Sequence, residues 1–157
     1  MDVTVRAASR DDVPEIVRLL ADDTLGAQRE LIEDPVAPVY LQAFDEMAEQ
    51  AGNDLLVAVI DDHVIGCLQL TITSGLSRRG VRRAQIEGVR VSSKHRGEKI
   101  GEQLVREAIA RARAAGCGLV QLTSDVSRLD ARRFYERLGF KATHIGMKLP
   151  LTPAKAD

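Results

Sequence analysis

Apolar and polar positions follow one another along the chain in patterns that predict strands and helices in turn. In residues 3–7 every second side chain is apolar, which is typical of a short strand. Ser9 and Asp12 then have the spacing of a capping box, and apolar residues recur at helical spacing over residues 13–20. The stretch 22–39 is polar and contains two prolines, so it predicts a loop or a broken helix.

The middle of the chain predicts a second helix followed by a hairpin. Apolar residues recur at helical spacing over residues 40–51, and Gly52 is a suitable residue to end that helix. Two apolar runs, 55–60 and 64–72, flank a polar turn, as expected of antiparallel strands. The later pattern predicts a strand at 86–91, a helix at 100–112 followed by Gly116, a strand at 119–122, a helix at 131–138 closed by Gly139, and one or two strands within 140–149.

This order of elements predicts an α/β fold with one mixed, mostly antiparallel sheet of about six to seven strands, flanked by about four helices. The chain has 157 residues, the size of one domain, and its sequence shows no internal repeat or linker. We therefore expect a single domain over residues 1–157, with residues 150–157 as a frayed tail.

The composition is that of a globular protein and narrows the function mainly by exclusion. Hydrophobic residues make up 45% of the chain and charged residues 29%, with a formal net charge of −1. A chain without net positive charge lacks the general field that attracts nucleic acids and anionic membranes, so we expect neither partner. A polar N-terminus, and the lack of any apolar run of about 18 residues, predict neither a signal peptide nor a membrane span.

The cysteines and histidines carry no sign of a metal centre or a disulfide. Cys67 and Cys117 lie within apolar runs far apart in the sequence, which indicates reduced thiols that pack as small apolar residues in a cytoplasmic protein. The three histidines lack the spacing of metal ligands, and we expect no metal site.

Residues 89–101 predict a strand that passes through a tight turn into an amphipathic helix. The first turn of a helix has backbone N–H groups without internal partners and the positive end of the helix dipole, and both stabilise an anion. Lys94, His95, Arg96 and Lys99 add local positive charge, and Gly97 allows a phosphate to approach the backbone closely. The segment suits a diphosphate, but a solvent-exposed helix start with basic residues would show the same pattern.

The six residues from Arg96 to Gly101 resemble the cofactor motif of the GNAT superfamily of N-acetyltransferases. One position departs from that motif, because Lys99 stands where glycine is commonest. The resemblance implies acetyl-CoA as co-substrate, with the upstream strand pairing its backbone to the pantetheine arm. The residues that it places against acetyl-CoA in this part of the chain are Val89, Arg90, Val91, Arg96, Gly97, Glu98, Lys99, Ile100 and Gly101.

Residues 131–140 resemble the second signature of the same superfamily and, with Glu87, supply the candidate catalytic groups. The resemblance places Tyr135 beside the cofactor sulfur as the acid for the departing thiolate, with Phe134 next to the cofactor; packing in the core is the alternative role for Tyr135. Glu87 is the candidate base, acting directly or through water, although a strand glutamate is often only solvated or ion-paired. The resemblance makes the backbone N–H of Val89 the oxyanion donor. Asp130 is either a cofactor contact or, as we favour, only the N-cap of the helix beginning at residue 131.

The acceptor is less constrained by the sequence than the cofactor. We expect a primary amine of a small molecule, attacking directly in a ternary complex. The C-terminal pattern, which includes Arg128 and His144, is similar to that of aminoalkylphosphonate N-acetyltransferases, which suggests an anionic acceptor. The basic residues between two predicted strands form either an electropositive lip or simply a solvated hairpin end; they are Arg78, Arg79, Arg82 and Arg83.

Two other functions and one assembly remain open at this stage. Acetylation of a protein N-terminus or lysine would be favoured by an acidic groove at Asp45, Glu46 and Glu49. A non-catalytic acyl-CoA sensor would be favoured by loss of the catalytic tyrosine, but Tyr135 is present. A homodimer is possible by analogy with the superfamily.

Overall fold

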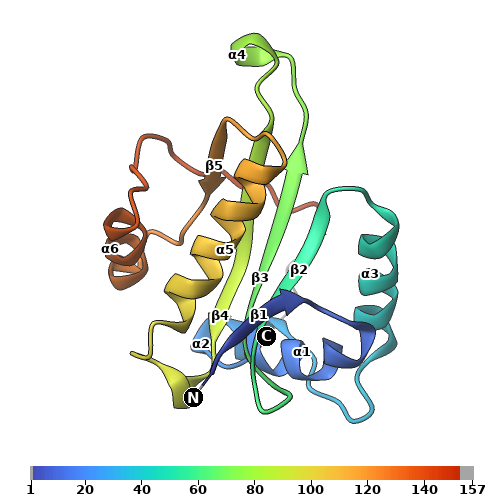
Figure 1. The fold of residues 1–157 in the computed structure, drawn as a ribbon. Helices are drawn as coiled ribbons and strands as arrows, with labels where there is room; N and C mark the ends of the chain where they lie inside the picture. Colours follow the sequence, from blue (N-terminus) through green and yellow to red (C-terminus); the bar gives the residue numbers. More distant parts are fainter. Residues whose placement is uncertain (1, 153–157) are drawn as a thin grey trace. The chain divides into compact units, whose positions relative to one another are not determined.

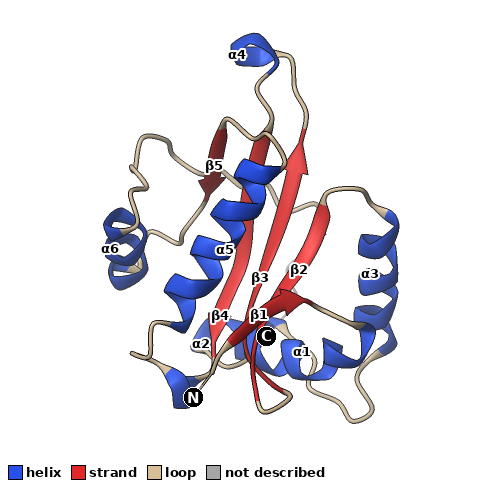
Figure 2. Cartoon of the chain, in the orientation of Figure 1, coloured by secondary structure: helices blue, strands red, loops and turns tan. Residues whose placement is uncertain are grey.

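The computed structural model describes residues 2–152 and divides the chain into two compact units, Met1–Leu122 and Thr123–Asp157. The first unit contains the sheet and most of the helices (Figures 1 and 2). Its elements in chain order are β1 (Thr4–Ala7), η1 (Arg10–Asp12), α1 (Val13–Leu20), α2 (Thr24–Arg29), α3 (Pro38–Glu49), β2 (Asn53–Ile60), β3 (His63–Thr73), α4 (Ser77–Gly80), β4 (Arg83–Val91), η2 (Ser93–His95), α5 (Ile100–Ala114) and β5 (Leu119–Leu122). The second unit contains α6 (Leu129–Arg137).

The strands form one sheet in the order β1-β2-β3-β4-β5. Successive strands pair antiparallel as far as β4, and β5 pairs parallel to β4 after the crossover through α5. Asp61 and Asp62 have φ values of 46° and 64°, which a two-residue hairpin turn between β2 and β3 requires. The expected hairpin, α/β class and mixed sheet are therefore confirmed.

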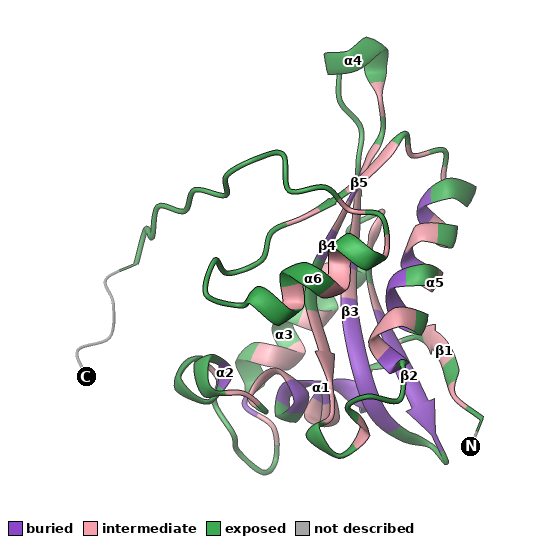
Figure 3. Cartoon of the chain, turned by 90° about the vertical axis from the view of Figure 1, so that its left-hand side faces the viewer, coloured by how far each residue is buried: buried purple, intermediate pink, exposed green. Residues whose placement is uncertain are grey.

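The core lies on both faces of this sheet. On one face, Ile16 and Leu19 of α1 pack against Val57 and Cys67, which are register partners in β2 and β3. Adjacent strand residues point to the opposite face, where α5 packs, and a Cβ at Gly66 would lie 3.0 Å from Leu104. Only glycine lets the helix approach β3 this closely. Figure 3 shows the buried residues concentrated in the central strands and the inward sides of α1 and α5.

Cys67 lies within this core as a free thiol and is almost fully buried. Burial raises the pKa of its thiol to about 12, because the charged thiolate loses its hydration there. Cys117, also free, is partly exposed just beyond α5. The expectation of two reduced thiols agrees with this arrangement, although only Cys67 is a core residue.

The predicted count of strands and helices is wrong: the described residues form five strands and six helices. A short helix, α2, forms within the stretch for which a loop or a broken helix was expected, and another, α4, forms in the basic connection between two predicted strands. Asp23 is the N-cap of α2 and accepts a hydrogen bond from Gly26 N at 2.6 Å. This cap was not predicted, because the polar residues and prolines of the stretch indicated a loop or a broken helix. In α4, Arg78 and Arg79 have φ values of 54° and 61°, so this element is closer to a tight turn than to a helix.

The expected strands within residues 140–149 are absent from the described part of the second unit. Ile145, Met147 and Leu149 have the period-2 spacing of a strand, yet their exposed fractions are 90%, 90% and 83%. Alternation gives a segment the propensity for a strand, but a strand also needs a hydrogen-bonded neighbour. These residues have no such neighbour in the described ladders, so the pattern alone misled the prediction.

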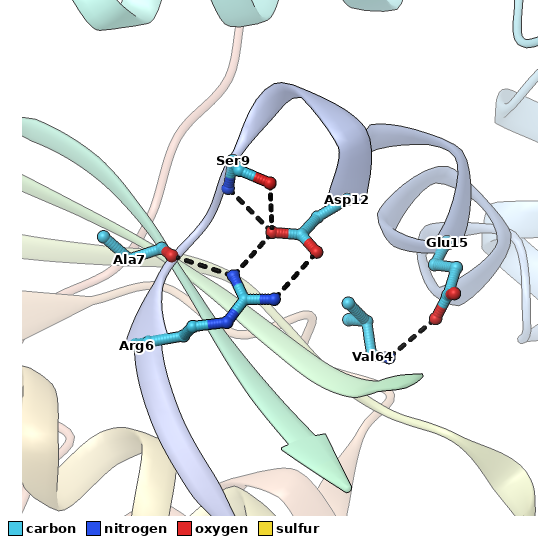
Figure 4. Close-up of polar contacts among 6 residues, drawn as sticks. All are labelled: Arg6, Ala7, Ser9, Asp12, Glu15 and Val64. Atoms are coloured by element: carbon cyan, nitrogen blue, oxygen red, sulfur yellow. Dashed lines mark hydrogen bonds and ion pairs between the residues drawn. The ribbon is translucent and has the colours of Figure 1, made fainter. Parts of the chain in front are cut away.

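The capping box predicted at Ser9 and Asp12 is confirmed and is part of a larger polar cluster (Figure 4). Asp12 Oδ2 accepts hydrogen bonds from Ser9 N at 2.7 Å and from Arg6 Nη1 at 2.7 Å, while Oδ1 accepts from Arg6 Nη2 at 3.0 Å. Three residues further on, Glu15 accepts a hydrogen bond from Val64 N at 2.6 Å. The start of the helical region is thereby tied to β1 and to the β2–β3 hairpin.

We expect Asp12→Asn to lower the free energy of unfolding by about 2 kcal/mol at pH 7, because it removes the charge that two guanidinium hydrogen bonds stabilise. The hydrogen bond from Arg6 lowers the pKa of Asp12 below its ordinary value of 3.8. A lowered folded-state pKa stabilises the protein above the unfolded value, and this contribution is lost as the pH falls through the folded value. Denaturant unfolding should therefore show that the free energy of unfolding of the variant lies well below that of wild type at pH 7 and closer to it at pH 3. Asp54→Asn, at an exposed position, is the control. An equal loss of unfolding free energy in Asp12→Asn at both pH values would contradict the stabilising role of the Asp12 charge.

Candidate functional site

A bulge interrupts the pairing of the C-terminal half of β4 with β3. Gln69 pairs with Glu87 and Cys67 pairs with Arg90, so the two residues Gly88 and Val89 lie opposite Leu68 alone. Gly88 has a φ of 61°, and Cys67 Sγ contacts its carbonyl at 3.6 Å. An inserted residue of this kind bends a strand and leaves part of the ladder unpaired. Gly88 was not among the residues predicted from the sequence, although an isolated glycine within a strand pattern is the usual signal of a bulge.

The edge of β4 that faces β5 is unpaired beyond Ile86, whereas β3 still pairs with Arg90 and Val91 on the other side. β5 pairs only with the first half of β4 and ends at Leu122, opposite Ile86. No strand within residues 2–152 pairs with residues 87–91 on that side. These residues therefore present backbone N–H and C=O groups to an extended ligand, as an exposed sheet edge does.

The strand continues through η2 into an uncapped helix N-terminus. Lys99 is the N-cap of α5, and its side chain makes no capping hydrogen bond. The first N–H groups of this 15-residue helix therefore remain available, and Gly97, with a φ of 84°, has no atom within 4 Å of the position of a Cβ. Open backbone donors at a helix N-terminus form an anion-binding arrangement. The geometry fits the diphosphate that the sequence suggested.

The side chains around this N-terminus are of mixed charge. Lys94 and Arg96 lie in or beside η2, and Arg96 Nη2 donates to the Asp22 carbonyl at 3.4 Å. His95 Nδ1 lies 3.0 Å from the Glu98 carboxylate, which directs that acid toward the imidazole. We call residues 87–101, from the bulge to the first turn of α5, the cofactor segment.

The backbone conformation at Lys99 explains why glycine is commonest at this position of the motif. Its φ of 62° and ψ of 17° are left-handed, a conformation that costs a residue with a Cβ about 1–2 kcal/mol. Glycine adopts this conformation without that cost, which accounts for its preference at this place in the motif. The backbone turn is therefore retained with lysine, at some expense of stability.

Glu87 lies at the start of the cofactor segment with an exposed side chain. Its register partner Gln69 is in the same strand phase as Cys67, so Glu87 points to the face of the sheet that α1 covers. Within the described residues, no side-chain hydrogen bond or ion pair involves Glu87. Its carboxylate can therefore accept a proton from a ligand without first breaking an internal contact.

The remaining candidates lie on α6, in the second unit. Tyr135 makes edge-to-face contacts with Phe134 at 5.0 Å and with Phe140 at 5.9 Å between ring centroids. The preferred role of Asp130 as N-cap is wrong, because α6 begins at Leu129 and its N-cap is Arg128. Asp130 is instead a fully exposed residue of the first turn, 3.7 Å from Arg133.

The basic hairpin end between β3 and β4 is remote from the cofactor segment within the first unit. It lies beyond the opposite end of β4 (Figure 1), and the strand spans about 13 Å from Arg83 to Glu87, the first residue of the segment, and about 26 Å from Arg83 to Val91. Arg82 Nη1 donates to the Ala115 carbonyl at 2.5 Å, and Arg83 Nη2 donates to Ser77 Oγ at 2.9 Å. These contacts favour a structural hairpin end over an acceptor-binding lip.

An acidic hollow of about 360 Å³ lies along α3. Asp45, Glu46 and Glu49 line it, as the sequence analysis envisaged for a groove. Arg10 donates to both carboxylate oxygens of Asp45, at 3.0 and 3.2 Å, and hydrogen bonding to this guanidinium lowers the pKa of Asp45. One of the three acidic side chains is therefore already neutralised.

Two further features are absent from the described part of the chain. No group of three or more His, Cys, Asp or Glu side chains is placed to hold a metal ion. Among the same residues, none of the helices combines the length and apolarity needed to cross a membrane.

Comparisons with known proteins show the family to which the chain belongs. Residues 15–140 match the model of the acetyltransferase (GNAT) family. The chain is 30% identical over 145 residues to glucosamine 6-phosphate N-acetyltransferase of Trypanosoma brucei brucei, covering 86% of this chain and 95% of that protein. A shorter stretch of 49 residues is 49% identical to aminoalkylphosphonate N-acetyltransferase of Salmonella typhimurium, and it spans only 31% of this chain and 32% of that relative.

A solved structure is similar over nearly the whole chain. The crystal structure of a transcriptional regulator from Bacillus halodurans C-125 has a TM-score of 0.93 and 48% sequence identity, covering 96% of this chain and 100% of that one. The family resemblance inferred from residues 96–101 is confirmed by the family match.

We expect Lys99→Gly to raise the free energy of unfolding by about 1 kcal/mol, since the relief of left-handed strain exceeds the added chain entropy of glycine. Thermal unfolding should show an increase of about 2–4 °C in Tm for a chain of this length. Ala110→Gly, at an exposed interior position of the same helix, is the matched control and should lower the stability by about 1 kcal/mol. A Lys99→Gly protein that melts below wild type would refute the strain at residue 99.

Proposed function

The chain belongs to the acetyltransferase (GNAT) family, and on that premise we propose that it transfers an acetyl group from acetyl-CoA to a primary amine of a small molecule by direct attack in a ternary complex. The observation that carries the proposal is the unpaired edge of β4 leading into the uncapped N-terminus of α5. An edge that offers backbone hydrogen bonds followed by an anion-binding helix start matches an extended amide-containing arm joined to a diphosphate.

In this proposal the cofactor segment divides the binding of acetyl-CoA between its two ends. Val89, Arg90 and Val91 pair their backbone with the pantetheine amides. The N–H groups of Gly97, Ile100 and Gly101 bind the diphosphate, with Arg96 adding positive charge and Glu98 and Lys99 completing the turn. Phe134 contributes an apolar contact, and Asp130 is retained only as a polar neighbour of the cofactor.

Acetyl transfer then needs three further groups. The amine must lose a proton before or during attack on the thioester, and Glu87 is the proposed base, because its carboxylate is exposed and makes no internal side-chain bond in the described structure. The N–H of Val89, at the bulge, is the proposed donor to the developing oxyanion. Tyr135 is the proposed acid that protonates the departing thiolate.

We propose an acceptor that carries an anionic group beside its amine. Support comes from the two relatives named above, whose names specify a phosphorylated amino sugar and aminoalkylphosphonates. Because Arg82 and Arg83 make structural contacts at the hairpin end, that cluster is not part of the proposed acceptor site.

A protein substrate is the second candidate, favoured by the acidic hollow on α3. A basic peptide would complement Glu46 and Glu49. The hollow is lined by residues of η1 and α3, and α3 packs against β2, α1 and η1 rather than against β4. The small-molecule acceptor is therefore the preferred proposal.

The proposal is tested by acetyl-CoA turnover across aminophosphonates, amino-sugar phosphates, neutral amines, polyamines and short peptides, with thiol release as the readout. We expect turnover with an anionic primary amine and a decrease in kcat of about 100-fold in Tyr135→Phe, because the variant lacks the donor to the thiolate. Turnover with peptides alone would replace the small-molecule proposal by the second candidate. Tight acetyl-CoA binding without turnover on any class would instead indicate a sensor.

A separate substitution tests the base. Glu87→Gln keeps the shape of the side chain but cannot accept a proton, so we expect kcat to fall about 100-fold while the Kd for acetyl-CoA is unchanged. Calorimetry and steady-state kinetics on the same preparation measure the two quantities. An unaltered kcat would show that a route through water, rather than Glu87, removes the proton.

A further inference from the structure

The connection between α1 and α2 lies against the cofactor segment at four points. Leu20, the last residue of α1, has its Cδ2 3.8 Å from the position of a Cβ on Gly88. Asp23 Oδ2 lies 3.2 Å from Arg90 Nε. Asp22 Oδ2 accepts a hydrogen bond from Ser93 N at 2.9 Å, and its carbonyl accepts from Arg96. Two consecutive aspartates thus contact the middle of the segment, at Arg90, Ser93 and Arg96.

Asp23 makes a second interaction, which holds its carboxylate in place beside Arg90. Its Oδ1 accepts the hydrogen bond from Gly26 N that begins α2. At Gly26 a Cβ would lie 1.9 Å from the carbonyl oxygen of Leu20, so the chain doubles back tightly between the two helices. One carboxylate therefore fixes both the start of α2 and the guanidinium of Arg90.

The Arg90 side chain is enclosed and depends on this partner. Its exposed fraction is 20%, and that of Asp23 is 27%. Arg90 Nη1 donates to the Val89 carbonyl at 2.9 Å, whereas the buried Nε has no hydrogen bond of good geometry within the described residues. Asp23 at 3.2 Å is the charge that compensates it, so removal of that charge would leave a partly buried cation beside the bulge.

We propose that Asp22 and Asp23 are positioning residues for the acetyl-CoA site: they hold the cofactor segment in its bulged form, and acetyl-CoA in turn orders the α1–α2 connection. The inference rests on the proposed function only in taking acetyl-CoA as the ligand. Because the same contacts join the two segments, stabilising either one stabilises the other.

The experiment compares Asp23→Asn with wild type by calorimetry with acetyl-CoA and by hydrogen exchange. Asparagine can still accept the hydrogen bond from Gly26 through its one oxygen and is an equally good N-cap, so the start of α2 is kept while the carboxylate oxygen opposite Arg90 is replaced by an uncharged NH2 group. We expect the Kd for acetyl-CoA to rise about tenfold. In wild type, acetyl-CoA should slow amide exchange over residues 22–27, and in the variant this protection should be largely lost.

Glu107→Gln is the matched control, because it removes the acid of the Glu107–Arg111 pair on α5, away from the connection. It should bind acetyl-CoA as wild type does. The double variant Asp23→Asn/Arg90→Gln should bind no more weakly than the worse single variant, since the two residues act as one unit. Should Asp23→Asn fail to fold, Asp22→Ala tests the same coupling through Ser93.

The outcomes separate this inference from the proposed function. No binding of acetyl-CoA to wild type would overturn the proposed function. Binding by wild type together with an unchanged Kd and unchanged protection of residues 22–27 in Asp23→Asn would overturn the positioning role alone. A lower Tm with normal binding would have the same meaning, because a merely structural contact changes stability and not affinity.

Discussion

The shortness of β5 is the constraint on which the candidate site depends. Because β5 ends opposite Ile86, the rest of β4 is left without a strand partner on that side. An unpaired edge is normally a liability that proteins cover or distort. Here the bulge at Gly88 bends the strand away at the point where its partner ends, and the same backbone continues into the start of α5. The same region of β4 thus exposes unpaired backbone groups along its edge and leads the chain into the N-terminus of α5.

The electrostatics of the site are local rather than global. The net charge of the chain is −1, and basic residues near the cofactor segment face acidic neighbours, such as Arg90 with Asp23 and His95 with Glu98. The most direct positive potential therefore comes from the backbone of the α5 N-terminus, which is uncapped. This arrangement favours a ligand that places its negative charge at one point and extends away along a neutral edge.

The sequence was most informative where chemistry and periodicity coincide. The passage from β4 into α5 was predictable, because alternation, glycines, basic residues and a helical stripe all occur within about twenty residues. The bulge was not, since it depends on a register between Gln69 and Glu87 that no local pattern specifies. The strand expected near Met147 failed for the related reason that pairing is a property of two segments. The contacts of Asp22 and Asp23 with residues some seventy positions away were equally invisible to local reasoning.

The two thiols differ in a way that matters for handling the protein. Cys67, buried with a pKa of about 12, remains protonated and inaccessible at neutral pH, whereas Cys117 is partly exposed. Reagents that trap a released thiol will therefore react with one protein site, giving a stoichiometric background of one equivalent in an enzyme assay. The same asymmetry makes Cys117 a single attachment point for a fluorophore or spin label, without any engineered substitution in the core.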